Sequence, residues 1–330
     1  MKRIVAIEIT PDFVRGVEVQ NPLTATPKIV GFGEVPLAAG VAGDSEVFDE
    51  SLLKAALSKL WIDQNFTTRK VILGIGGRKI LNREFETPVA DIARIRSKLK
   101  FETANILPPQ MTDALLDFYP TEIKPSESGL DLVHGLLIAA PQQVVEQLVK
   151  VAKDAGLSVE GVDYLPFGLA RTARKAFGAT GEYLLVNIRP MATDIIALKL
   201  GVPQLIRVIP NGVSVRPREV GKHVDTDDRT SFNTEQSSSS DPITSLASGV
   251  RSTINFYSNK GGAPTALLLA GEGSLSPEVQ ERLPQEVELG AGLLSMADVF
   301  PGGTENLSQD PIQNAAALGL LGVALRGLKD

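Results

Sequence analysis

Two short segments of this chain carry residue types that could bind a phosphate group and a metal ion. Residues 8–11 read Glu-Ile-Thr-Pro, and residues 187–190 read Asn-Ile-Arg-Pro, each position standing 179 residues after its counterpart. A turn that follows a strand can offer backbone N–H groups to phosphate, while a carboxylate at the strand end holds Mg²⁺ through water. The spacing therefore points to phosphate chemistry at two matching turns.

The residues within the two turns weaken this interpretation. A phosphate turn of this kind needs an aspartate just before it and a glycine inside it. The first turn instead has Glu8 and Thr10, and the second has Asn187 and Arg189. Both turns also contain proline, which has no backbone N–H to donate.

A third candidate is a glycine-rich turn near residue 271. A buried-type strand over 266–270 leads into Gly271-Glu272-Gly273-Ser274, and a helix follows. Glycine at Gly271 and Gly273 would let the backbone approach a flat base or a sugar, which a side chain would prevent. A plain strand-to-helix turn explains the same residues equally well, so the pattern leaves both interpretations open.

The predicted strands that position these turns occur twice along the sequence. Apolar runs at 4–9, 13–19 and 29–36 are repeated at 184–188, 194–198 and 205–210. Such a repeat predicts two related lobes, and a cleft between lobes is where ligands commonly bind. In the first repeat Val17 and Val19 alternate with Glu18, which predicts a half-buried antiparallel sheet.

The rest of the chain divides around this duplication. Asp49 is expected to cap a helix, and a strand over 70–75 completes a compact α/β lobe. From about 80 to 165 the pattern becomes that of a small inserted α+β module. We assign residues 1–178 to the first lobe and 179–330 to the second. The polar, Ser-rich stretch at about 222–241 is predicted to be a mobile loop.

Composition excludes several classes of function. The chain has 330 residues, no Cys, only two His and a net charge of −6. Thiolate metal sites, Cys nucleophiles and Ser–His–Asp groups are therefore excluded or nearly so, and an acidic chain is not expected to bind nucleic acid. We expect a cytoplasmic protein without direct membrane insertion, because the apolar run at 315–325 is well short of the ~20 residues that span a bilayer.

The repeated meander, the inserted module and the strand leading into a glycine turn resemble the actin-like superfamily. Within it the chain is most similar to the PilM family of type IV pilus assembly proteins, which is related to the division protein FtsA. The resemblance covers essentially the whole chain. The segments that most resemble the family lie at 31–37, 71–78, 83–88, 106–109, 163–167 and 317–319.

The resemblance implies a duplicated, ribonuclease H-like two-lobed α/β fold with an inserted SHS2-type subdomain. It implies a cytoplasmic scaffold, located at the inner face of the membrane, that binds the amino-terminal tail of the membrane protein PilN in a groove beside the inserted module. The residues that contact this tail are unknown. Actin-like folds often self-associate, and the sequence leaves that question open.

The resemblance also implies an ATP site in the cleft. Relatives carry Asp-x-Gly in both phosphate turns, whereas this chain has Glu8 to Thr10 and Asn187 to Arg189. Glu8 keeps the charge on a longer arm, so Mg²⁺ binding could survive. Arg189 adds bulk, yet it could pair with phosphate directly. Gly271 and Gly273 keep only part of the adenosine turn. We expect ATP and Mg²⁺ binding to be weakened or lost, and little or no ATPase activity.

Two other functions remain as alternatives. An FtsA-like membrane tether would need a C-terminal amphipathic helix, whereas this chain is expected to end just after its closing helix. A small-molecule kinase of the same superfamily would need a catalytic aspartate near the second phosphate turn. Asp194 is the nearest candidate, and we expect it to be structural.

Overall fold

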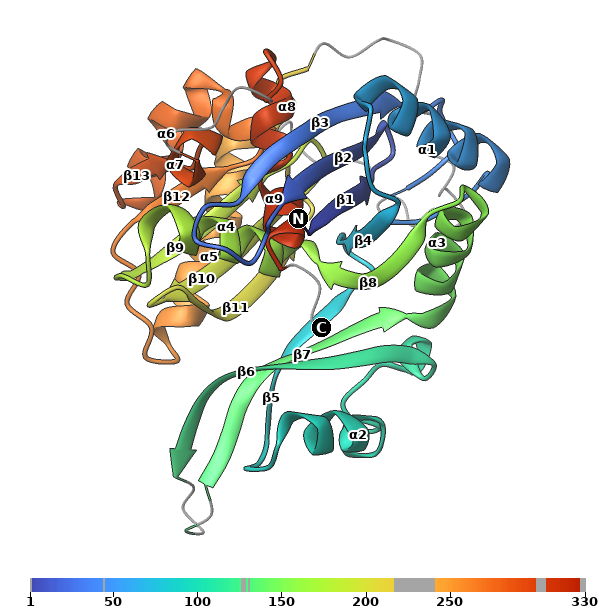
Figure 1. The fold of residues 1–330 in the computed structure, drawn as a ribbon. Coiled ribbons are helices and arrows are strands. Elements are labelled where there is room, and N and C mark those ends of the chain that lie inside the picture. The colour runs from blue at the N-terminus through green and yellow to red at the C-terminus, as the bar shows by residue number, and fades with distance from the viewer. Residues whose placement is uncertain are drawn as a thin grey trace, which may run out of the picture.

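Three β-sheets organise the computed structural model of this chain (Figure 1). The structure describes residues 2–43, 45–125, 129, 131–216, 241–300 and 307–326. Two of the sheets have five strands each, and the third has three. The predicted mobile loop at 222–241 lies outside the described residues except for Asp241, which caps a helix.

The first sheet has the strand order β3-β2-β1-β4-β8. Its strands are β1 (Arg3–Ile9), β2 (Phe13–Gln20), β3 (Lys28–Pro36), β4 (Lys70–Ile75) and β8 (Ser158–Tyr164). Helix α1 (Glu50–Gln64) contacts β2 and β3, and α9 (Leu318–Ala324) contacts β1, β2 and β4. As expected, Asp49 caps α1 by accepting a hydrogen bond from the Leu52 N–H.

The first sheet is more deeply buried than the alternation of its residues predicts. Glu18, expected on a solvent face, is only 1% exposed. Its carboxylate accepts hydrogen bonds from the backbone N–H and the hydroxyl of Thr67, which precedes β4. A buried carboxylate is tolerated when donors of this kind satisfy it. The half-buried prediction was therefore wrong, because helices cover both faces of β2.

The second sheet repeats the first, with the order β11-β10-β9-β12-β13. Its strands are β9 (Glu182–Ile188), β10 (Thr193–Lys199), β11 (Val202–Ile209), β12 (Leu267–Ala270) and β13 (Ala291–Leu293). The bounds of β1 and β9 differ by the predicted 179 residues. The register agrees too, because Glu8 pairs with Arg15 and Asn187 pairs with Asp194.

Helices cover the second sheet and link it to the first. Helix α4 (Leu165–Phe177) lies between the sheets and contacts β8, β10, β11 and α9, while α5 (Pro242–Ser258) contacts β10, β11 and α6. The C-terminal half also contains α6 (Pro277–Val287), α7 (Met296–Val299), α8 (Pro311–Ala316) and the 3₁₀ turn η2 (Glu272–Leu275). Within the described part of the chain, no helix has the length and apolar character needed to cross a membrane.

The third sheet projects from the first lobe, below the two larger sheets in Figure 1. It has the order β5-β7-β6, with β5 (Leu81–Pro88), β6 (Ala114–Pro125) and β7 (Asp131–Pro141). Helix α2 (Ile92–Glu102) covers one face of this sheet, and the 3₁₀ turn η1 (Pro109–Met111) precedes β6. Helix α3 (Gln142–Asp154) then returns the chain to β8 and lies against α1.

Candidate functional site

The first candidate phosphate turn is closed by its own hydrogen bonds. The backbone N–H of Thr10 donates to the carbonyl of Phe13 at 2.9 Å, and the N–H of Phe13 donates to the Thr10 hydroxyl at 3.0 Å. Glu8 is buried at the end of β1, where its carboxylate lies 3.4 Å from Nη1 of Arg15. The donors of Thr10 and Phe13 are thus already engaged, and the expected metal-binding carboxylate faces an arginine.

The second turn has the same backbone closure and a different set of charges. The N–H of Arg189 donates to the carbonyl of Ala192 at 3.0 Å, which matches the bond from Thr10 to Phe13. Asn187 donates from Nδ2 to Asp194 at 2.9 Å, and Nε of Arg189 lies 3.1 Å from the same carboxylate. Asp194 thus holds both residues that were predicted to face phosphate, which is a structural role.

The glycine turn packs against the protein itself. Gly271 follows β12 with φ of +81°, a conformation that favours glycine. A Cβ at this position would lie 2.5 Å from both the Asn187 side-chain oxygen and the Ile188 carbonyl. A Cβ at Gly273 would lie 2.6 Å from the carbonyl of Val213. Close packing against the end of β9 is therefore sufficient to require both glycines.

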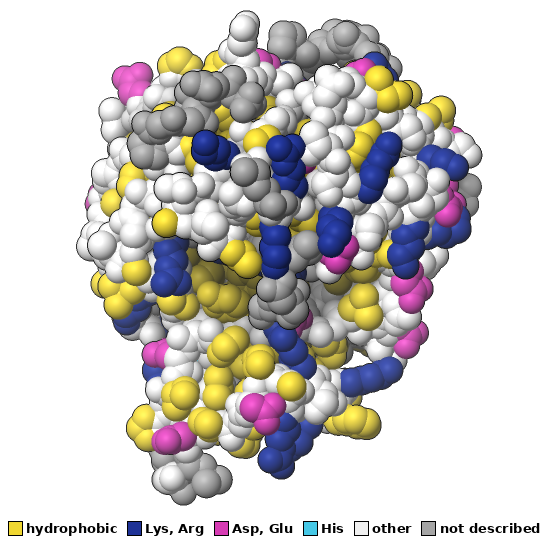
Figure 2. Space-filling view, in the orientation of Figure 1, with side chains coloured by type: hydrophobic (Ala, Val, Ile, Leu, Met, Phe, Trp, Pro, Cys, Tyr) yellow, Lys and Arg dark blue, Asp and Glu magenta, His cyan; other side chains and the backbone are white. Residues whose placement is uncertain are grey.

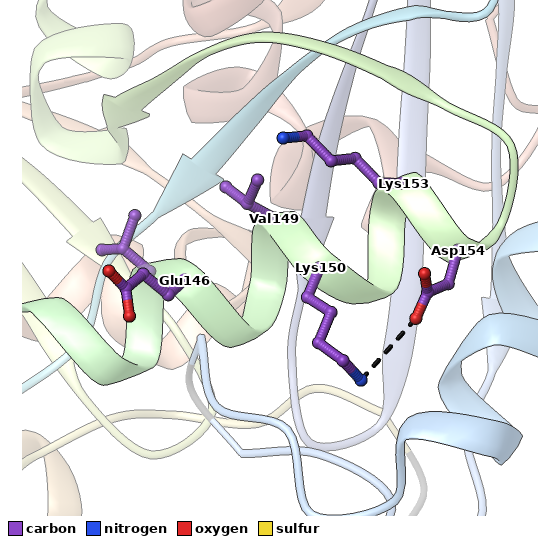
Figure 3. A pocket seen from close by; sticks show the side chains of 6 residues that line it. Glu146, Val149, Lys150, Lys153 and Asp154 are labelled. Carbon is purple, nitrogen blue, oxygen red and sulfur yellow. Dashed lines mark ion pairs between the residues drawn. The ribbon is translucent and has the colours of Figure 1, made fainter.

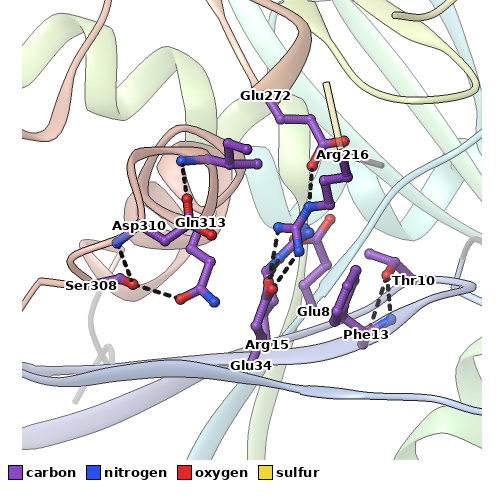
Figure 4. A network of polar contacts seen from close by, with 11 residues as sticks. Glu8, Thr10, Phe13, Arg15, Glu34, Arg216, Glu272, Ser308, Asp310 and Gln313 are labelled. Carbon is purple, nitrogen blue, oxygen red and sulfur yellow. Dashed lines mark hydrogen bonds and ion pairs between the residues drawn. The ribbon is translucent and has the colours of Figure 1, made fainter. Parts of the chain in front are cut away.

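A chain of alternating charges joins the first turn to the glycine turn, from one lobe to the other (Figure 4). Arg15 on β2 contacts Glu8 on one side and Glu34 of β3 on the other, where Nε lies 2.8 Å from the carboxylate. Arg216, which lies after β11, donates to Glu34 at 2.6 Å and to Glu272 of η2 at 3.0 Å. We call these five residues the cleft network. Arg216 connects the first sheet to the glycine turn of the second.

The cleft network is largely buried, and every member contacts a group of opposite charge. Glu34 and Glu272 have side chains only 4% and 2% exposed. Burial by itself would raise the pKa of the Glu34 carboxyl, but Arg216 and Arg15 outweigh that effect and hold the pKa below its ordinary value. The same carboxylates raise the pKa of Arg216 despite its burial. The guanidinium of Arg216 also lies 4.4 Å from the centre of the Phe13 ring.

This arrangement forms a clamp between the two lobes, because Arg216 contacts Glu34 in the first and Glu272 in the second. Each of its charged side chains has an oppositely charged partner within the chain. Among the described residues, no group of three or more His, Cys, Asp or Glu side chains could hold a metal ion. Among the described residues at the turns and in the cleft network, four carboxylates contact three arginines. The described side chains at these turns are therefore engaged with partners from within the chain.

Sequence patterns identified only part of the cleft network. Glu8 and the 271–273 turn were found from their positions, whereas Arg15, Glu34 and Arg216 were not. The signal for Arg15 and Glu34 is a charged residue at a strand position with buried neighbours on both sides. Arg216 lies outside any helix or strand, so no periodicity marks it.

A second candidate site is an open hollow of about 390 Å³ along α3 (Figure 3). Two valines and four charged residues line it: Val145, Glu146, Val149, Lys150, Lys153 and Asp154. Helix α3 joins the third sheet to the edge strand of the first, so the hollow lies where these two parts meet. An apolar floor with charged sides is suited to a short peptide with both apolar and charged groups.

Comparisons with known proteins place the fold. Neither a protein-family model nor a curated protein sequence matches this chain. A solved structure described as a PilM-PilN type IV pilus biogenesis complex matches with a TM-score of 0.79, 18% identity and 99% coverage of both chains. The ethanolamine utilization protein EutJ from Carboxydothermus hydrogenoformans matches with a TM-score of 0.52 and 12% identity, over 99% of this chain and 90% of its own. The chain therefore has an actin-like fold of the PilM type.

Proposed function

We propose that this protein is an actin-like scaffold of type IV pilus biogenesis that binds the amino-terminal tail of a PilN-like inner-membrane partner. One observation carries the proposal, namely the match to the PilM-PilN complex over 99% of both chains. The second solved structure covers the chain equally well but fits it far less closely. In this proposal the partner holds the protein at the inner face of the membrane.

The hollow along α3 supports the tail-binding role. It lies at the junction between the third sheet and the first lobe, where a groove beside the inserted module was expected. Val149 is half-buried on its floor, and the exposed Lys153 lies at its side. An extended tail with apolar side chains could pack on the valines, while Lys153 pairs with an acidic group or a backbone carbonyl.

The cleft network supports a scaffold that does not turn over nucleotide. Glu8 and Arg189 each have a charged partner within their own lobe, and Arg216 joins the two lobes directly. In a nucleotide-dependent relative of this fold the ligand itself would bridge the lobes. We therefore propose that the clamp replaces the nucleotide as the connection between the lobes.

A peptide titration tests the tail-binding proposal. The full chain is titrated by calorimetry with a peptide that corresponds to the amino terminus of the PilN-like partner. We expect saturable binding that Lys153→Glu weakens by about tenfold, the loss of roughly one charge-assisted contact. Lys98→Glu on α2 makes the same charge change away from the hollow and should leave binding unchanged. Absence of saturable binding would refute the tail-binding role.

A separate titration with ATP and Mg²⁺ tests the cleft. We expect no saturable binding to the native chain and no phosphate release above background. A triple variant serves as the comparison, with the substitutions Glu8→Asp, Thr10→Gly and Arg189→Gly. It restores part of the Asp-x-Gly pattern found in the family that this chain resembles. Tight binding with steady phosphate release by the native chain would show that the cleft is an active site.

A further inference from the structure

Cations gather at the end of the molecule opposite the cleft turns. Three segments meet there: the β2–β3 loop at 21–28, the end of α4 with the following residues at 174–181, and the β10–β11 turn at 199–201. None of the three contains Asp or Glu, although the whole chain has 39 such residues and a net charge of −6. They hold four exposed cations: Lys28, Arg174, Lys175 and Lys199. We call this surface the basic rim.

Contacts between the three segments make the basic rim one continuous surface. Lys175 donates from Nζ to the carbonyl of Ala25 at 3.4 Å, which joins α4 to the first-lobe loop. The N–H of Leu200 donates to the carbonyl of Gly181 at 2.8 Å, which joins the second-lobe turn to the residues after α4. The rim therefore extends over both lobes, with the end of α4 between them.

Large apolar side chains project from the same surface. Leu23, Phe177 and Leu200 are 61%, 42% and 56% exposed, and each comes from a different segment of the rim. Isolated exposed apolar residues are common on protein surfaces. Three of them among four cations, with no carboxylate in the three segments, form an amphipathic surface instead.

The conformation of Leu200 is an independent indication that this side chain serves a purpose. Leu200 and Gly201 form a two-residue hairpin turn in which both φ values are positive, at +51° and +73°. Such turns favour Asn followed by Gly, and a leucine with positive φ is strained. The equivalent first-lobe position, 179 residues earlier, has Asn21 with φ of +53°. The second lobe thus has an exposed leucine where asparagine would be more stable.

We propose that the basic rim adsorbs onto an anionic lipid bilayer, with its lysines and arginine at the headgroups and Leu23, Phe177 and Leu200 inserted between them. An anionic bilayer surface attracts cations and accepts apolar side chains at the same time. Figure 2 shows that dark blue and yellow side chains lie next to one another on the face that it draws. This inference does not depend on the partner tail, because the rim and the hollow along α3 have no residue in common.

Vesicle flotation of the full chain tests the proposal. We expect the protein to float with vesicles of phosphatidylcholine and phosphatidylglycerol, to remain unbound with phosphatidylcholine alone, and to dissociate at high salt. Each lysine near such a surface contributes about fivefold to partitioning. The double variant Lys28→Gln and Lys199→Gln should therefore partition about thirtyfold more weakly, whereas Lys98→Gln with Lys100→Gln on α2 should match the native chain.

Leu200→Asn separates adsorption from folding. The substitution should raise the thermal unfolding midpoint, because asparagine tolerates a positive φ, and should still weaken flotation several-fold. Flotation that is equal with and without phosphatidylglycerol, or equal losses in the two lysine double variants, would overturn the proposal. Binding to duplex DNA without flotation would also overturn it and would assign the rim to nucleic acid.

Discussion

The hairpins β1–β2 and β9–β10 share the same backbone pairing but carry different charged side chains at equivalent positions. In both, a residue near the end of the first strand pairs with the residue seven positions later. In the first lobe this pair is a carboxylate and a guanidinium, Glu8 and Arg15. In the second it is an amide and a carboxylate, Asn187 and Asp194, with Arg189 beside them. A shared hydrogen-bond ladder therefore fixes where side chains lie and leaves their charges free to differ.

The difference in charge also decides which of the two hairpins takes part in ion pairs between the lobes. Asp194 is satisfied by two residues of its own hairpin. Arg15 is shared with Glu34, and Glu34 accepts a second arginine, Arg216, which contacts Glu272. The first-lobe charges thus belong to a network that spans both lobes, whereas the second-lobe charges form a local one. Loss of a first-lobe charge should therefore cost more.

The largest expected effect comes from breaking the equivalent pair in each lobe. Arg15→Met removes the guanidinium that contacts Glu8 and leaves Glu34 with one arginine, and should lower the free energy of unfolding by about 4 kcal/mol. Asp194→Asn leaves Arg189, whose side chain is 20% exposed, able to reach solvent, and should cost about 1 kcal/mol. Urea unfolding of both variants measures the difference. Equal losses would mean that the two hairpins are energetically equivalent.

Removal of the connection between the lobes should have a smaller effect. Arg216→Met leaves Glu272 without its cation, while Glu34 keeps Arg15, and should cost about 2 to 3 kcal/mol. The two lobes should also separate, which small-angle scattering would detect as an increased radius of gyration. Arg282→Met removes an arginine that pairs with Asp241, Glu278 and Glu286 within the second lobe, and serves as the control. An unchanged radius for Arg216→Met would indicate that other contacts hold the lobes together.

The smallest expected effect is a dependence on pH in the acid range. The pKa of Glu34 is lowered in the folded chain, so its contribution to stability is complete above the unfolded value of about 4.5 and is lost as the pH falls through the lower folded value. The native chain should therefore lose stability relative to Glu34→Gln below about pH 4.5. Urea midpoints measured at several pH values give this difference. A difference that stays constant with pH would contradict the lowered pKa.

The fold could be predicted from the sequence to a large extent. The repeated meander, the 179-residue offset and the cap at Asp49 agree with the structure. These features depend on backbone periodicity and on contacts within a few residues, which a single sequence displays. The division into 1–178 and 179–330, with an insertion at about 80–165, stays a prediction, as does the nucleotide role of the six candidate cleft residues.

The sequence by itself determined the repeated order of strands and the positions of Glu8, Thr10, Asn187 and Arg189 in matching turns, because the spacing of strands and turns is a local property. The actin-like architecture followed from the resemblance to a known family. Tertiary structure alone decided what those residues contact. Arg15 and Glu34 are 19 residues apart, and Arg216 reaches Glu34 across 182 residues. The Arg15–Glu34 pair follows from the register of β2 and β3 within one sheet, whereas the Arg216–Glu34 pair depends on how the two lobes pack. The two lobes therefore share one fold and differ in chemistry.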